Sequence, residues 1–142
     1  MIRWDRDEWG PYFREIADRL NLREWAISID NTGPGNPNAA AAVRHSLGRK
    51  VAMIDLSEHF LRESEDYQRH VAVHEILHLH HAQEKHMLES TLDPEQFRFW
   101  VLLNEYGHDA ETEAIAPLMP LPSTVLGGRP AKQSRKKSIP KQ

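Results

Sequence analysis

The segment from residue 70 to residue 86 constrains the fold of this chain most, because its histidines can act together only on a helix. It holds six of the nine histidines, and the pattern HExxH runs within it from His74 to His78. Residues four apart lie one turn above each other on one face of an α-helix. The residues around the motif are largely uncharged, which is typical of a helix packed on a core. We therefore expect a helix from Tyr67 to about Met87 that presents His74 and His78 together.

A histidine pair with this spacing is a candidate metal site. Two neutral imidazoles, a third protein ligand and an open position for water form a usual catalytic zinc site. The chain has no cysteine, so His, Asp and Glu must supply any ligands. Glu75 is placed to take a proton from the bound water and to deliver it to a leaving group. We expect one zinc ion per chain, held by His74 and His78, with Glu75 as the catalytic residue.

The third ligand is expected in "LLNEYGHDAETEAIAP", which belongs to the next long helical pattern. Glu105 is our first candidate, because a buried charged side chain needs a partner and a metal would supply one. Asp109, four residues later, could then accept a hydrogen bond from the second ring nitrogen of a ligating histidine. His108 is the alternative third ligand, and it could equally be a core histidine whose nitrogens are satisfied. Asp109 and Glu111 are further alternatives.

The other histidines of the segment have different expected roles. The same face also carries His70 and His81, and because a helix rises about 1.5 Å per residue, the ends of this strip are too far apart to bind one ion, which makes His81 a poor third ligand. We expect His81 to line the cleft or to orient a ligand through a hydrogen bond. His80 and His86 are expected to be solvated.

Short alternating segments precede the histidine-rich helix. Residues 7–20 form an amphipathic pattern with Pro11 in the first turn, which predicts an N-terminal helix. "WAISID", "AAAVRHSLG" and "KVAMIDLS" follow and are separated by turn residues. Three short strands in succession indicate a small three-stranded antiparallel sheet.

A second long helix closes the predicted domain. Asp93 and Pro94 are typical of a helix start, with a capping side chain followed by proline in the first turn. The helix should stop near Pro117. With 142 residues, the chain has the length of one domain. We expect an α+β domain over residues 1–122 and a basic, disordered tail over residues 123–142.

The distribution of charge bears on possible partners. From Gly127 onward there are six Lys or Arg and no acidic residue, which leaves twelve basic and 21 acidic residues in the first 126. Such an acidic body argues against binding nucleic acid, apart from weak contacts of the basic tail. The sequence contains no apolar run that would span a membrane, and its N-terminus "MIRWDRDEWG" has no apolar core of a secretory signal. We expect a cytoplasmic protein, and nothing in the sequence points to an oligomeric state.

Two motifs together resemble a known family. HExxH followed by "NEYGHD", residues 104–109, is similar to the zincin metallopeptidases of the gluzincin type, in which a second helix carries E-x-x-x-D. The order of the elements and the proline-rich "APLMPLP" resemble short HExxH proteins of phage and bacterial genomes related to the ImmA/IrrE-like group. The resemblance spans residues 4–122. It implies a minimal zincin-like metallopeptidase fold, with Glu105 as metal ligand and Asp109 hydrogen-bonded to a ligating histidine.

The same resemblance implies a function. We expect a zinc metallopeptidase that hydrolyses peptide bonds in a protein substrate, or alternatively a zinc-stabilised binding or regulatory module with no or vestigial peptidase activity. "KVAMIDLS" would be the sheet edge beside the cleft, where an extended peptide could pair with the backbone. Tyr106, His81 and Arg44 are candidate donors to the oxyanion of the tetrahedral intermediate.

Overall fold

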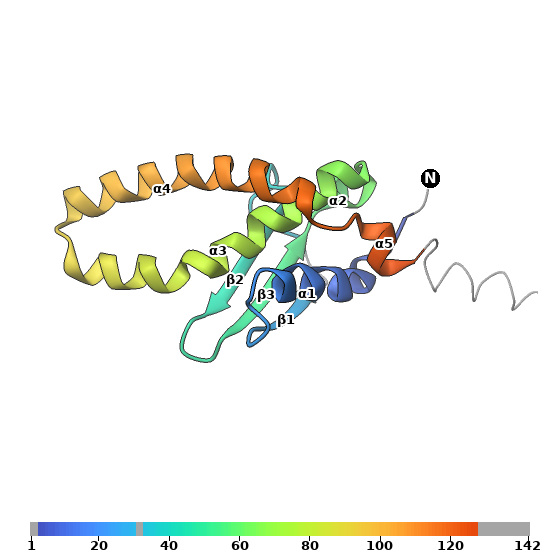
Figure 1. Ribbon diagram of the computed structural model, residues 1–142, viewed down its shortest axis with the longest axis horizontal. Coiled ribbons are helices and arrows are strands. Elements are labelled where there is room, and N and C mark those ends of the chain that lie inside the picture. Colours follow the sequence, from blue (N-terminus) through green and yellow to red (C-terminus); the bar gives the residue numbers. More distant parts are fainter. Residues whose placement is uncertain (1–2, 31–32, 128–142) are drawn as a thin grey trace, which may run out of the picture.

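The computed structural model describes residues 3–30 and 33–127. It contains a small sheet that helices cover on one face (Figure 1). The elements follow in the order η1 (Arg6–Trp9), α1 (Gly10–Arg19), β1 (Ala26–Asp30), β2 (Ala41–Ser46), β3 (Val51–Leu56), α2 (Glu58–Arg62), α3 (Glu65–Thr91), α4 (Pro94–Ile115), η2 (Ala116–Leu118) and α5 (Pro122–Leu126). The predicted α+β class is therefore confirmed. The short helices α2 and α5 were not predicted.

The sheet is mixed, and the prediction of a wholly antiparallel sheet is wrong. Its strand order is β1-β3-β2. β2 is antiparallel to β3, with Ala41 opposite Leu56, whereas β1 is parallel to β3, with Ala26 opposite Val51. The reason lies in burial, since the side chains of Ala52, Ile54 and Leu56 are fully buried and β3 is the strand best suited to the centre. The chain therefore crosses from β1 to the far edge before it returns through β3.

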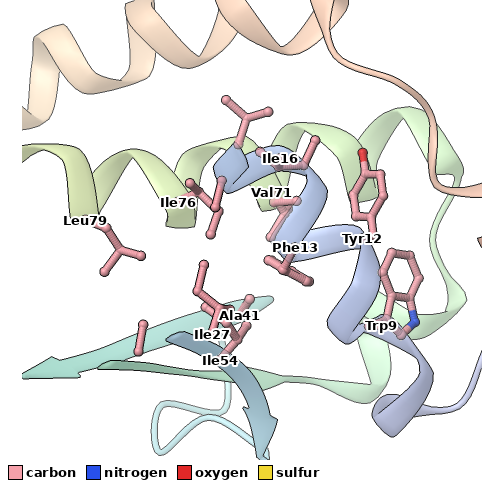
Figure 2. Close-up of a cluster of buried hydrophobic side chains, with 14 of the residues drawn as sticks. Trp9, Tyr12, Phe13, Ile16, Ile27, Ala41, Ile54, Val71, Ile76 and Leu79 are labelled. Atoms are coloured by element: carbon pink, nitrogen blue, oxygen red, sulfur yellow. The ribbon is translucent and has the colours of Figure 1, made fainter. Parts of the chain in front are cut away.

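The core lies between the sheet and the helices α1 and α3 (Figure 2). In α1, Pro11 occupies the first turn, where its missing N–H breaks no helical hydrogen bond. The fully buried ring of Trp9 packs edge-on against Phe60, with 4.8 Å between ring centroids, and also contacts Phe13. Such aromatic pairs stabilise the core beyond their buried area. These aromatic contacts hold η1, α1 and α2 together.

Both long helices begin at capping residues. The Ser64 hydroxyl accepts a hydrogen bond from the Tyr67 amide at the start of α3. At the start of α4, Asp93 and Gln96 form a reciprocal capping box, and Pro94 is in the first turn. Each cap satisfies an amide that the helix leaves free. The predicted start of α4 at Asp93 and its stop before Pro117 are confirmed.

The two long helices form an antiparallel hairpin (Figure 1). α3 lies between the sheet and α4, and the distal ends of both helices extend beyond the sheet. Among the described residues, no helix combines the length and the apolar character needed to cross a membrane.

The start of the expected tail is part of the fold. Residues 123–126 belong to α5, and the Ser123 amide donates a hydrogen bond of 2.7 Å to the Glu65 carboxylate. The Tyr12 hydroxyl donates a hydrogen bond of 2.8 Å to the Pro120 carbonyl oxygen nearby. These contacts join the C-terminal segment to α1 and α3. The rest of the expected tail, residues 128–142, lies outside the described residues.

Candidate metal centre

Three histidines from two helices meet beside the sheet. His74 and His78 lie one turn apart on α3, with ring centroids 4.9 Å apart. His108 on α4 faces both, with centroid separations of 4.2 Å to His74 and 4.3 Å to His78. One ring nitrogen of each lies within 4.8 Å of the other two. The local helix repeat accounts for the first pair, and the packing of α4 on α3 adds the third ring.

The two ring nitrogens of His108 have different surroundings. Its Nε2 lies 2.9 Å from the carbonyl oxygen of His74, so the proton on Nε2 is donated to that oxygen. Its Nδ1 is buried and has no hydrogen-bond partner among the described residues. The ring as a whole is 1% exposed. This hydrogen bond fixes the tautomer that leaves a lone pair on Nδ1, which is the arrangement found in metal-binding histidines.

The electrostatics of the site favour neutral imidazoles. Burial lowers the pKa of His74 to about 4 and that of His78 to about 3, and the nearby His108 contributes to both shifts. Asp109 opposes the shift of the His74 pKa, with its carboxylate 3.8 Å from the His74 Nδ1. At neutral pH both rings therefore keep a lone pair that can bind a cation.

Glu75 lies beside this group with its side chain only 9% exposed. Burial, together with repulsion from the Glu105 carboxylate, raises the pKa of Glu75 to about 8. A carboxyl group with a pKa near the working pH can both accept and release a proton. The residue therefore has the properties of a general base and acid.

A cleft of about 620 Å³ opens next to Glu75 and His78. Its walls come from β2 and the following turn, from α3 and from α4. A second hollow of about 320 Å³ lies on the side of His74, and both hollows share Ala41 and Glu75. Glu75 therefore lies between two hollows that follow the beginning of β2. The edge strand beside the cleft is therefore β2. The prediction that "KVAMIDLS" forms this edge is wrong, because that segment is β3 and lies in the centre of the sheet.

The structure places the other predicted site residues around this group. Glu105 is exposed and lines the cleft, but it is not among the residues whose ligand atoms lie together with those of His74 and His78. Asp109 lies beside His74 at a distance longer than a hydrogen bond. The side chain of His81 lines the cleft and its Nε2 lies 2.9 Å from Glu111.

Sequence reasoning did not find the contact between His81 and Glu111. Together with His108, these two residues form a second group of neighbouring ligand atoms. The only sequence pattern that places Glu111 near this group is its spacing of three residues from His108 on one helix.

The three candidate oxyanion donors differ in position. Tyr106 is 83% exposed, and Arg44 is hydrogen-bonded to the Asp55 carboxylate at 3.0 Å. Of the three, His81 lines the cleft. His80 is exposed and, like His86, has a solvated side chain.

No protein-family model, curated protein or solved structure matches this chain. Its function is therefore inferred from the side chains of the site.

Proposed function

We propose that this chain is a zinc-dependent hydrolase with His74, His78 and His108 as metal ligands. The observation that carries this proposal is the orientation of His108, whose Nε2 is bonded to the His74 carbonyl oxygen while its buried Nδ1 has no partner. A buried polar atom without a partner costs about 1–3 kcal/mol. A metal ion bound by Nδ1 would offset that cost. The proposal takes His108 as the third ligand in place of Glu105.

Zinc suits this set of donors. Three imidazoles with an open fourth position form one of the usual catalytic zinc sites. Ligand nitrogens around a tetrahedral zinc ion lie roughly 3.3 Å apart. Here the nitrogens lie within 4.8 Å of one another, so small side-chain rotations would complete the site. When bound, the ion would supply a Lewis acid and would make a water molecule acidic near neutral pH.

The protein's own groups would do the rest of the chemistry. Glu75, next to His74, would take a proton from the attacking water and deliver it to the leaving amine. His81 also lines the cleft, but its Nε2–H is donated to the Glu111 carboxylate, so a neutral His81 has no second N–H for the substrate carbonyl oxygen. The resemblance to the zincin metallopeptidases supports peptide-bond hydrolysis as the reaction.

An extended peptide is the proposed substrate. The hollows on both sides of Glu75 follow the edge strand β2, and an edge strand offers free backbone groups to a peptide. The small side chains of Ala39, Ala40, Ala41 and Ala42 line these hollows, which leaves room for the side chains of a peptide. The substrate would therefore pair with β2 and pass the metal site beside Glu75.

Metal content tests the ligand set. Purified wild-type protein, saturated with zinc and then dialysed, is expected to contain an equimolar amount of zinc by mass spectrometry. His74→Ala and His108→Ala should lose it, whereas Glu105→Ala should retain it. Circular dichroism of each variant controls for folding. Zinc that is retained in His108→Ala and lost in Glu105→Ala would reject the ligand set proposed here and favour Glu105.

Peptide hydrolysis tests the reaction. Glu75→Gln is expected to keep its zinc and to lose about 10²- to 10⁴-fold in turnover of a peptide mixture, because it cannot accept a proton. Exposed Glu84 on the same helix offers a matched control, and Glu84→Gln should retain full activity. Equal turnover by wild type and Glu75→Gln would contradict the proposed role of Glu75. Zinc binding without any turnover in the wild type would favour a zinc-stabilised binding module.

A further inference from the structure

The helix α4 has an apolar face on the side opposite to His108. Phe99, Leu102, Leu103 and Tyr106 are 64%, 69%, 57% and 83% exposed. Their spacing of three, four and seven residues places them in one continuous stripe along the helix. We call these four residues the outer stripe. The two aromatic rings alone leave on the order of 300 Å² in contact with solvent.

The part of the hairpin that carries the outer stripe packs little against the rest of the chain. No residue from 84 to 107 is buried, and this stretch extends beyond the sheet (Figure 1). Helices in water owe most of their stability to the packing of an apolar face. Contiguous apolar surface of this kind usually marks an interaction site. The outer stripe is therefore expected to be covered by a partner.

The charges beside the outer stripe indicate which partner. Arg98 and Glu105 are seven residues apart, so both flank the stripe on the same side of α4. Among the described residues, neither of them makes an ion pair within the chain. If a second α4 packs antiparallel to the first, Arg98 of each copy faces Glu105 of the other. At these two positions the face is thus complementary in charge to itself.

We propose that the outer stripe is the interface of a homodimer in which the two α4 helices pack antiparallel around a two-fold axis beside Leu102. In this arrangement Phe99 of each copy packs against Leu102 of the other, and Tyr106 reaches the first turn of the other helix. The two hairpins together form a four-helix arrangement with a shared apolar centre. A two-fold axis lets a single patch provide both halves of the interface.

The dimer does not depend on the proposed hydrolase activity. His108 faces α3, whereas the outer stripe faces away from it. One flank of the interface, at Glu105, also borders the cleft beside β2. Leu102→Glu tests the dimer and His108→Ala tests zinc binding, so failure of one proposal can be told from failure of the other.

Sedimentation equilibrium of the full chain tests this proposal over a wide dilution series. The wild type is expected to have about twice the mass of the 16.4 kDa chain. Leu102→Glu should shift the protein to a monomer with an unchanged circular dichroism spectrum. Leu118, which is 76% exposed and lies outside the outer stripe, offers a matched control, and Leu118→Glu should remain a dimer. A wild type that is monomeric throughout, or a dimer that persists in Leu102→Glu, would overturn the proposal.

Charge reversal tests the antiparallel pairing itself. Arg98→Glu places two carboxylates opposite each other at both symmetric positions, and should raise the dissociation constant at least about tenfold. The double variant Arg98→Glu with Glu105→Arg exchanges the charges and should restore dimerisation. A double variant no better than Arg98→Glu alone would contradict this pairing.

Discussion

Replacing Glu75 by Gln is expected to stabilise the metal-free protein in a pH-dependent way. The folded protein raises the pKa of Glu75 from 4.5 to about 8. Below pH 4.5 the carboxyl group is protonated in both the folded and the unfolded chain, and it costs no stability. As the pH rises from 4.5 through 8, the unfolded chain releases this proton first, which shifts the equilibrium towards unfolding. Gln carries no such proton, so the variant avoids the loss.

The size of the effect follows from the shift of the pKa. Each pKa unit corresponds to about 1.4 kcal/mol, and by pH 7 about 2.5 units of the interval have been crossed. The full effect is then about 3.5 kcal/mol, and water in the cleft beside Glu75 reduces it. We expect Glu75→Gln to raise the free energy of unfolding by about 2–3 kcal/mol at pH 7 and by close to zero at pH 4.5. The lowered pKa values of His74 and His78 remove stability as the pH falls below 6.5, but they do so in both proteins and cancel in the comparison.

Urea unfolding in the presence of a chelator measures this difference at the two pH values. Glu84→Gln, an exposed change on the same helix, is the control and should alter stability by less than about 0.5 kcal/mol at either pH. A gain for Glu75→Gln that is the same at both pH values would show that ionisation is not its cause. No gain at pH 7 would mean that Glu75 is already solvated in the metal-free protein.

Three further results are expected. Zinc at about 100 times its dissociation constant should raise the free energy of unfolding by about 2.7 kcal/mol in wild type and not in His74→Ala, and an equal rise in both would place the binding elsewhere. Phe60→Ala should lower the free energy of unfolding by about 3–5 kcal/mol in urea titrations, because it opens a cavity against Trp9, and a loss below about 1 kcal/mol would contradict that packing. Asp93→Ala should speed amide exchange at the start of α4 about fivefold without changing exchange in β3, since the cap is worth about 1 kcal/mol, and unchanged exchange would show that the capping box adds nothing.

The elements of this protein that depend on neighbouring residues were predictable from its sequence. The cap at Asp93, the proline in the first turn of α1 and the start of α4 all follow from interactions within four residues. The shared face of His74 and His78 follows from the helix repeat. The sheet was predicted only in part, because three strands in succession can pair in more than one order. Which strand takes the centre depends on how deeply the rest of the folded chain buries each strand.

By itself, the sequence determined where the long helices begin and that one of them presents a histidine pair with an adjacent glutamate. Only the tertiary structure decided that His108 faces this pair, that Glu105 lies at the wall of the cleft and that β2 forms its edge. The physical reason is that the helix repeat defines positions around one axis, whereas the rotation of α4 about its own axis is chosen by packing against α3. The same rotation that turns His108 inward leaves the outer stripe of α4 in solvent.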